Sequence, residues 1–426
     1  MNRSIVAVLV GTFTLRFSTG LTGLLLTYYL SQLPEHGGPE VGPATFGVIA
    51  ATFYASELVF SPFLGVLSDR YGHHRMMQVG PLFGILAVVI TFLTTNLLVI
   101  GGTRILEGGA TAASVPSILG FIAAATAADE LLRGRAVARF EAATLAGLLA
   151  GFIVAGGLWQ LLGPIAFLVN ACIYGVSLLI YRFGVDPKLD SSRATNRQMA
   201  LSRYLDILKG SHVWLLAPTW IAINAVLGLY TTQTIFQLVK EPTPKFADQV
   251  LMGGFEPTQV SLGLAIGGVL FFAGLLYWGG KFKNMRRTTI ILYGVAGGAA
   301  LIVAGLGINH SRDLPVFVLL AFGALGAVGL FVLAGATPAA IGLLADMTEA
   351  YPDDRGAIMG LYSVFLGIGQ IVGNLIGGVA GDVRGLDGIF AASFVLLTIA
   401  LVPLARLRRY EHFVAGSPQP AVLTDQ

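Results

Sequence analysis

The sequence predicts an all-α polytopic membrane protein in which twelve transmembrane helices form two pseudo-symmetric six-helix bundles. Three observations predict this fold: an apolar composition, an uneven distribution of Lys and Arg, and an internal repeat. Of the 426 residues, 55% are hydrophobic and only 12% are charged, and the mean hydropathy is +0.77. Soluble domains average about 25% charged residues. This chain therefore has too few polar side chains to cover a water-facing surface.

Twelve apolar runs are separated by polar breaks, and each is long enough to cross a bilayer as a helix of about 20 residues. We expect the spans at residues 5–31, 45–67, 77–97, 99–126, 140–160, 163–182, 211–238, 258–279, 288–308, 314–344, 357–380 and 387–405. Met1 leads directly into the first span, so we expect no cleavable signal peptide. The single cysteine, Cys172, excludes an intramolecular disulfide.

The basic residues set the orientation of these spans, because cytoplasmic loops are enriched in Lys and Arg. With the N-terminus inside, the inner segments hold 20 Lys and Arg residues and the outer loops hold 4. The remaining two, Arg16 and Arg104, fall within spans. We therefore expect both termini on the cytoplasmic side of a plasma membrane, the inner membrane in a bacterium.

An internal repeat divides the chain into halves. A gap-free offset of 222 residues pairs Pro116 with Pro338 and Arg133-Gly134 with Arg355-Gly356, and three spaced glycines fall in the same register. Parallel repeats of this kind suggest two bundles that rock about a central site. We expect an N-terminal bundle at 1–185, a cytoplasmic linker at 186–210, a C-terminal bundle at 211–410 and a cytoplasmic tail at 411–426.

The predicted loop between the second and third spans carries a compact charged motif made of Gly65, Asp69, Arg70, Gly72 and Arg75. Gly65 permits close helix approach, Gly72 permits a tight turn, and the two arginines can bind carboxylates or lipid phosphates. This loop resembles the signature loop of the major facilitator superfamily. The length, the twelve spans and the central linker agree with that family along nearly the whole chain.

The resemblance implies that Asp69 is a cytoplasmic latch that stabilises the outward-open state. The alternative is a basic loop that only fixes topology. We expect His73 and His74 to be partly charged surface residues and not metal ligands. The second half keeps only Gly279-Gly280-Lys281-x-Lys283-x-x-Arg286-Arg287, without the acid, so we expect a latch there to be weaker or absent.

Four ionisable residues fall inside spans, where such residues are costly and functional by default: Arg16, Glu57, Arg104 and Glu107. The rise of 1.5 Å per residue places Arg16 and Glu57 at a common depth, about 18 Å from the inner ends of their helices. The charges of two arginines and two glutamates sum to zero, which indicates that these residues form ion pairs.

The segment Arg104-Ile-Leu-Glu107-Gly108 resembles a pattern in the fourth helix of the superfamily, and the resemblance gives Arg104 a role in proton coupling. Burial favours a neutral carboxyl group and a nearby arginine favours a charged one, so Glu57 or Glu107 is suited to exchange a proton. The alternative is a structural ion pair. If Arg104 satisfies both glutamates, Arg16 is free to bind an anionic substrate.

Neutral polar residues in the C-terminal half are candidates for a substrate cavity. Trp220, Asn224 and Thr231 fall on one face of the seventh span with Tyr230 and Gln233 beside it, and Gln370 and Asn374 share a face of the eleventh. Each of these residues either lines a pocket or serves packing and hydrogen bonding between helices.

Small-residue motifs recur in the fifth and eleventh spans, at Gly147, Gly151 and Gly156 and at Gly369, Gly373 and Gly377. They predict close helix packing. They also resemble the glycine motif of the family's antiporters, although Phe152 and Asn374 stand where that motif has proline.

The sequence favours a secondary transporter working by alternating access, most specifically a proton-coupled exporter of amphipathic or lipophilic small molecules. The alternative is a proton symporter or uniporter for a polar or anionic metabolite, with Arg16 as the substrate cation. A scaffold or receptor is disfavoured because the chain has no sizeable soluble domain. An enzyme or a primary pump is disfavoured because the sequence has no phosphate-binding loop. We expect a small-molecule substrate, protons and membrane lipids as partners, no nucleic acid, no cofactor, no metal, and a monomer.

Overall fold

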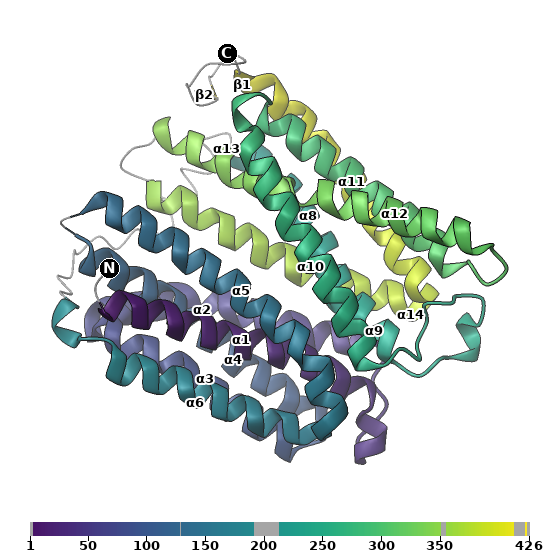
Figure 1. Ribbon diagram of the computed structural model, residues 1–426, viewed down its shortest axis with the longest axis horizontal. Helices are drawn as coiled ribbons and strands as arrows, with labels where there is room; N and C mark the ends of the chain where they lie inside the picture. Colours follow the sequence, from purple (N-terminus) through teal and green to yellow (C-terminus); the bar gives the residue numbers. More distant parts are fainter. Residues whose placement is uncertain (1–2, 128, 191–212, 351–354, 413–421, 424–426) are drawn as a thin grey trace. The chain divides into compact units, whose positions relative to one another are not determined.

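The computed structural model describes residues 3–127, 129–190, 213–350, 355–412 and 422–423, and these are almost entirely helical (Figure 1). The chain forms two compact units. The first comprises Met1–Asn196 with Phe255–Ala265, and the second comprises Arg197–Gly254 with Ile266–Gln426. Residues 191–210 of the predicted linker lie outside the described residues.

The first unit contains six long helices that lie alongside one another in Figure 1. Helix α1 packs on α5 and α6, while α4 packs on α2 and α3, and α3 also packs on α6. Three short 3-10 turns, η1 to η3, occupy Leu33–His36, Gly163–Ile165 and Pro187–Leu189. The helices are α1 Arg3–Ser31, α2 Pro43–Tyr71, α3 His73–Leu93, α4 Leu97–Ala125, α5 Glu130–Leu162 and α6 Ala166–Gly184.

The second unit is built around α8 and the long helix α14, which pack against each other, with α11 against α12, α13 and α14. Its helices are α8 Val213–Gly228, α9 Ile235–Val239, α10 Pro257–Gly279, α11 Arg287–Asn309, α12 Val316–Leu333, α13 Ala336–Ala350 and α14 Arg355–Tyr410. The first residues of α10 belong to the first unit. A π-helix, η4, joins α8 to α9 at Leu229–Thr234, and 3-10 turns η5 and η6 occupy Pro244–Phe246 and Gly280–Lys283. Strands β1 Glu411–His412 and β2 Val422–Leu423 form one short antiparallel pair.

Ten described helical stretches are long and apolar enough to cross a membrane. Two of them, Leu132–Gly184 and Leu361–Tyr410, have 53 and 50 residues, which is enough for two crossings each. Non-helical backbone at Arg384 and Gly385 divides α14 into two helices. The predicted all-α fold with twelve crossings is therefore confirmed.

The tenth predicted span is not one continuous helix, because α12 ends at Leu333 and α13 begins at Ala336. Pro338 explains the break, since it has no N–H to donate to the carbonyl group of Ala334, four residues earlier. The offset partner Pro116 lies inside α4, which continues across it.

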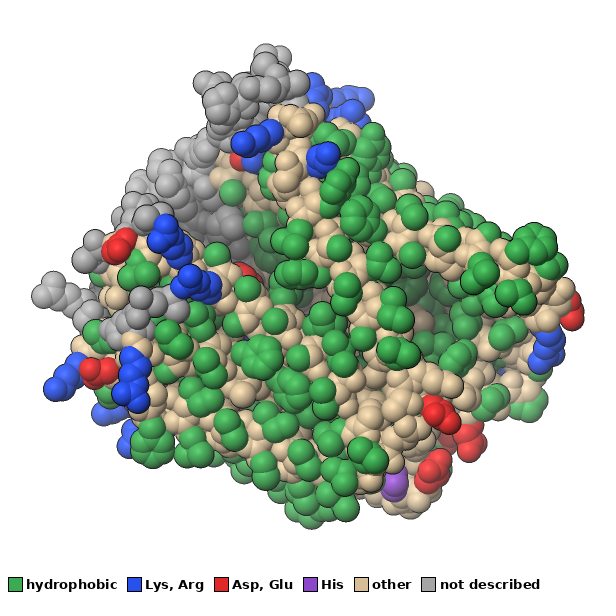
Figure 2. Space-filling model, viewed as in Figure 1, with side chains coloured by type: hydrophobic (Ala, Val, Ile, Leu, Met, Phe, Trp, Pro, Cys, Tyr) green, Lys and Arg blue, Asp and Glu red, His purple; other side chains and the backbone are tan. Residues whose placement is uncertain are grey.

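Hydrophobic side chains cover the helices on the face that Figure 2 shows, and the coloured charged side chains lie toward helix ends. Exposed residues along the spans include Phe63, Leu98, Leu161 and Val316. Such a surface suits the hydrocarbon core of a bilayer and not water.

Glycines set how closely the helices approach. A Cβ atom at Gly147 of α5 would lie 2.6 Å from the carbonyl oxygen of Phe13 in α1, and one at Gly151 would clash with the carbonyl oxygen of Phe17. In the second unit, a Cβ atom at Gly369 would lie 2.7 Å from the Ile221 carbonyl oxygen. Three further motif glycines are as crowded: Gly156 by Pro257, Gly373 by Ala225, and Gly377 by Leu229.

We predict that Gly151→Leu lowers the free energy of unfolding by at least 1–3 kcal/mol, which is about the cost of overpacking a tight contact. Gly157→Ala is the matched control, because it lies on the same helix with nothing within 4 Å of its Cβ position. The control should retain or raise stability, since alanine is the better helix former. Thermal unfolding in detergent measures both, and equal losses in the two variants would contradict the packing assignment.

Candidate functional site

A buried ion pair lies about two to three turns from the start of α4. Arg104 Nη1 donates to Glu107 Oε2, and both side chains are buried. The two residues are three apart and so share one helix face. The guanidinium group of Arg104 also lies over the ring of Phe53, 4.9 Å from its centroid. This cation is therefore held from two sides.

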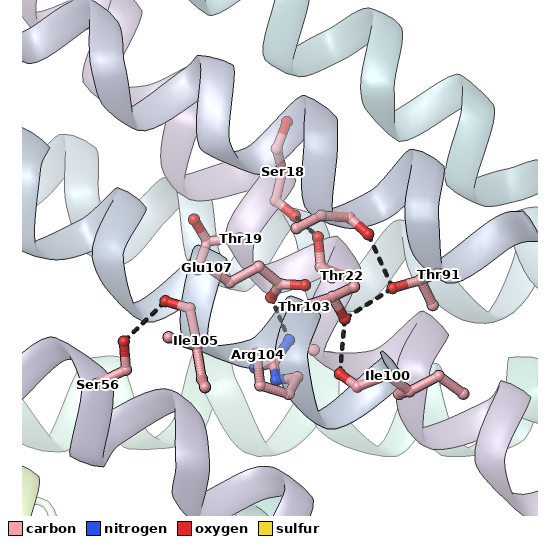
Figure 3. A network of polar contacts seen from close by, with 12 residues as sticks. Ser18, Thr19, Thr22, Ser56, Thr91, Ile100, Thr103, Arg104, Ile105 and Glu107 are labelled. Carbon is pink, nitrogen blue, oxygen red and sulfur yellow. Dashed lines mark hydrogen bonds and ion pairs between the residues drawn. The ribbon is translucent and has the colours of Figure 1, made fainter. Parts of the chain in front are cut away.

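Hydroxyl and amide groups fix the helices around this pair (Figure 3). Thr103 Oγ1 lies 3.0 Å from Thr91 Oγ1 and joins α4 to α3, and Ser56 Oγ donates to the Ile105 carbonyl oxygen and joins α2 to α4. Next to Glu107, a Cβ atom at Gly108 would clash with the backbone of α2. Such close, hydrogen-bonded contacts leave Arg104 and Glu107 little room to separate.

A second charged group centres on Arg16 of α1. Its guanidinium group interacts electrostatically with Glu57 of α2 and with Glu141 of α5. Arg16 and Glu57 are half-buried and Glu141 is exposed. One cation thus interacts electrostatically with two carboxylates from different helices, without a direct ion pair to either among the described contacts.

Sequence reasoning missed Glu141 because the fifth span was expected to begin at residue 140. Helix α5 begins at Glu130 instead, so Glu141 lies about three turns inside it. With this residue included, the candidate site holds three glutamates, Glu57, Glu107 and Glu141, and two arginines, Arg16 and Arg104. The pairing expected of the four span residues is seen for Arg104 and Glu107, and Glu141 adds a further carboxylate that interacts with Arg16.

The candidate cavity residues of the second unit lie along a helix that changes type. The seventh predicted span runs as α8, then as the π-helix η4 containing Tyr230, Thr231 and Gln233, then as α9. Trp220 and Asn224 are buried, whereas Thr231 is exposed. The wider π-helical turn shifts the register of the residues that follow. Single π-helical turns within α-helices are frequent at functional sites.

Most polar groups in this region are engaged by the helices themselves. Asn224 Nδ2 donates to the Trp220 carbonyl oxygen and Asn374 Nδ2 to that of Gln370, while Gln233 Nε2 donates to the Asn374 carbonyl oxygen. The ring of Trp220 stacks on Tyr362, with centroids 5.2 Å apart. Among the described residues, nothing pairs with the buried Trp220 Nε1, Gln370 Oε1 or Asn374 Oδ1. The same holds for the buried Gln237 Nε2 of α9.

The motif between the second and third spans forms the turn from α2 to α3. Gly72 has a φ of +95°, a conformation that favours glycine. Arg70, Arg75 and the Asp69 side chain are exposed, and Asp69 Oδ1 lies 4.0 Å from His73 Nε2. A Cβ atom at Gly65 would lie 3.7 Å from Pro116, in ordinary contact. The Asp69 carboxylate is thus available at the end of its helix.

The expectation that His73 and His74 are surface residues is wrong, because both are buried. His73 Nδ1 lies 2.8 Å from Ser68 Oγ, and His74 Nε2 lies 3.0 Å from the Tyr181 carbonyl oxygen of α6. The turn at Gly72 points these rings back into the bundle. They hold α3 to its neighbours.

A carboxylate caps the third helix of each half. Asp190 Oδ2 accepts from the backbone N–H of His74 at 2.8 Å, at the start of α3. Glu411 accepts from the backbone N–H groups of Arg287 and Thr288, at 2.8 and 3.2 Å, at the start of α11. An anion at a helix N-terminus satisfies free N–H groups and complements the helix dipole. Residue 411, expected to begin a tail, is therefore buried structure.

The acid absent from the loop motif of the second half is supplied by another helix. Arg287, at the start of α11, forms an ion pair with Asp346 of α13 and lies over the ring of Phe282. Asp346 falls just beyond the predicted tenth span, so sequence reasoning did not consider it. The expectation of a weaker or absent latch in the second half stays a prediction.

Twelve apolar crossings with ion pairs and amides buried among them define a multi-pass membrane transport protein, because intramembrane charges mark substrate and ion pathways. A model of the Major Facilitator Superfamily matches residues 8–336 and again residues 254–422. The chain belongs to this superfamily and is a transporter of small molecules, not an enzyme.

Relatives and solved structures agree with this family. The chain is 24% identical over 364 residues to Multidrug resistance protein 2 of Bacillus subtilis (strain 168), covering 83% of this chain and 84% of the relative. It is 26% identical over 381 residues to Tetracycline resistance protein, class C, of Escherichia coli, covering 87% of each. The crystal structure of nucleoside transporter NupG superposes with a TM-score of 0.72 at 12% identity, over 95% of this chain and 98% of that one.

We predict that Glu107→Gln destabilises the protein by about 3–5 kcal/mol, because it leaves the buried Arg104 without its counter-ion. The double variant Arg104→Met with Glu107→Gln removes both charges and should recover much of that loss. Thermal unfolding of the single and double variants gives the coupling energy. A double variant that loses the sum of the two single losses would show that the pair does not interact.

We predict that Asp190→Ala lowers stability by about 1 kcal/mol, the usual cost of losing a helix N-cap, and that Asp190→Asn loses less because an amide oxygen still accepts. Hydrogen exchange at His74 and its neighbours should rise in the alanine variant. Unchanged exchange there would remove the capping role.

Proposed function

We propose that the chain is a secondary active transporter that works by alternating access and exports amphipathic or lipophilic small molecules in exchange for protons. The observation that carries this proposal is the sharing of Arg16 between Glu57 and Glu141. A single guanidinium group neutralises one carboxylate, and the other retains a charge that a proton or a cationic substrate can neutralise. Competition between these two for one carboxylate couples their movements in opposite directions.

The two charged groups suit different roles. Arg104 and Glu107 are both buried and in direct contact, so they suit a fixed element that holds α4 and sets the local field. Glu57 and Glu141 come from two helices and retain exposure, so protons and substrates can reach them. We assign proton exchange to the group of Arg16, Glu57 and Glu141.

The alternative is symport or uniport of a polar or anionic metabolite with Arg16 as the substrate cation. That role requires an arginine whose charge is not already balanced. Arg16 faces two carboxylates, which favours the exporter. The relatives named for multidrug and tetracycline resistance support export of amphipathic compounds.

The remaining assignments complete the proposal. We assign Asp69 and its loop to a cytoplasmic latch. Substrate contacts fall to the polar residues around the π-helix, with Trp220 Nε1, Gln370 Oε1 and Asn374 Oδ1 as the available atoms. We place the protein as a monomer in the plasma membrane, the inner membrane of a bacterium, with both termini cytoplasmic.

We predict that Glu57→Gln and Glu141→Gln each reduce efflux driven by a pH gradient by at least tenfold, because the amide can no longer exchange a proton. Binding of a lipophilic dye should persist in both variants. The measurement is dye flux from proteoliposomes with an imposed pH gradient. Glu256→Gln, at an exposed carboxylate outside this group, is the matched control and should transport normally.

Two results would overturn this assignment. Normal gradient-driven flux in both glutamine variants would exclude the Arg16 group as the proton site. Loss of binding on Arg16→Lys for an organic anion, with no dye transport by the wild-type protein, would establish the alternative.

A further inference from the structure

Three side chains that can ligate a metal meet in the second unit, away from the charged groups described above. Asp248 follows η5, His310 follows the end of α11, and Asp387 follows the break in α14. One ligand atom from each lies within 4.8 Å of the others. We propose that Asp248, His310 and Asp387 bind one divalent transition-metal cation of the zinc class.

A buried polar network holds the three segments at this spacing, and it uses the residue next to each ligand. Gln249 Oε1 accepts from Asn309 Nδ2 at 3.2 Å and from the backbone N–H of Leu386 at 3.0 Å. Gln249, Asn309 and Leu386 are all buried. They adjoin Asp248, His310 and Asp387 in turn, so each ligand is attached to backbone that the network fixes.

The ligands themselves are oriented by further contacts. Asn309 Nδ2 donates to Asp387 Oδ1 at 2.8 Å, and His310 Nε2 lies 2.9 Å from Asp387 Oδ2. A hydrogen bond to a carboxylate ligand is the kind of outer contact that orients metal sites. Asp387 thus presents one oxygen to Asn309 and the other toward the imidazole ring.

The donor set selects the class of cation. Three protein ligands with a fourth position open to water are typical of zinc sites with an exchangeable ligand. Magnesium and calcium prefer oxygen donors alone, whereas imidazole suits zinc, copper and nickel. Neighbouring ligands of a tetrahedral zinc ion lie roughly 3.4 Å apart. The ligand atoms of Asp248, His310 and Asp387 lie at most 4.8 Å apart. Small side-chain rotations are enough to bring them to the spacing of a zinc site.

The site is accessible and its effect is local to one unit. Asp248 and His310 are exposed, so a hydrated cation reaches them directly. Once bound, the cation cross-links the segment after η5, the end of α11 and the second part of α14. A ligand that binds only the folded state stabilises it in proportion to the logarithm of its concentration over its dissociation constant.

The test uses the full-length protein in detergent, purified without a histidine tag and stripped with a chelator. Zinc is titrated against a chromophoric chelator, and thermal unfolding is followed with and without zinc. The wild-type protein should bind one zinc ion and gain thermal stability with it. His310→Gln and Asp248→Asn should each weaken zinc binding at least tenfold and lose the zinc-dependent gain.

His36→Ala is the matched control, because it removes an exposed histidine elsewhere in the described chain and should bind zinc as the wild type does. The metal-free thermal stability of His310→Gln shows whether that variant is folded; if it is not, the Asp248→Asn result decides. Zinc affinity equal in the wild type and both ligand variants overturns the proposal. So does equal stabilisation by magnesium, which would show a nonspecific acidic surface.

Discussion

The structure depends on one constraint, which is that a charge in a low-dielectric interior must have a partner. Arg104 lies on α4 with Glu107 beside it and the ring of Phe53 over it. Taking these ions from water costs several kcal/mol each, and only direct contact and good geometry offset that cost. The two ions lie on one face of α4, so burying them requires that this face be covered by neighbouring helices. Helices α2 and α3 pack on α4, and Phe53 of α2 covers the cation.

The need to pair polar groups in a low-dielectric interior also applies to the backbone, and it explains why the fold follows from the sequence. In hydrocarbon, backbone N–H and C=O groups must be satisfied internally, so each long apolar run becomes a helix. Run length and the placement of Lys and Arg then give the number and direction of crossings. Pro338 interrupts the tenth predicted span, because a missing N–H breaks a helix without making the segment less apolar. The twelve crossings were therefore predictable, while the break between α12 and α13 was not.

The charged site was predictable only in part. Arg104 and Glu107 share a helix, so their spacing along the sequence was enough to pair them. Recognising Glu141 as part of the charged site depended on knowing where α5 begins. Helix ends are the features that sequence patterns locate least well. Asp346 and Arg287 are 59 residues apart and meet only through packing. The π-helix at Leu229–Thr234 has no composition that distinguishes it from α-helix.

The carboxylate caps show how the repeat is used at the level of single contacts. Asp190 and Glu411 each follow the last helix of a half, 221 residues apart, and each caps the third helix of the same half. The offset in the sequence repeat is 222, so the two caps arise at nearly equivalent positions from different residue types. Aspartate reaches one N–H group, whereas the longer glutamate reaches two.

Each contact ties the end of one helix to the start of another within its own unit. Under the proposed alternating access, each half must keep its internal packing while it moves. A cap at this position meets that requirement without placing a charge inside the membrane.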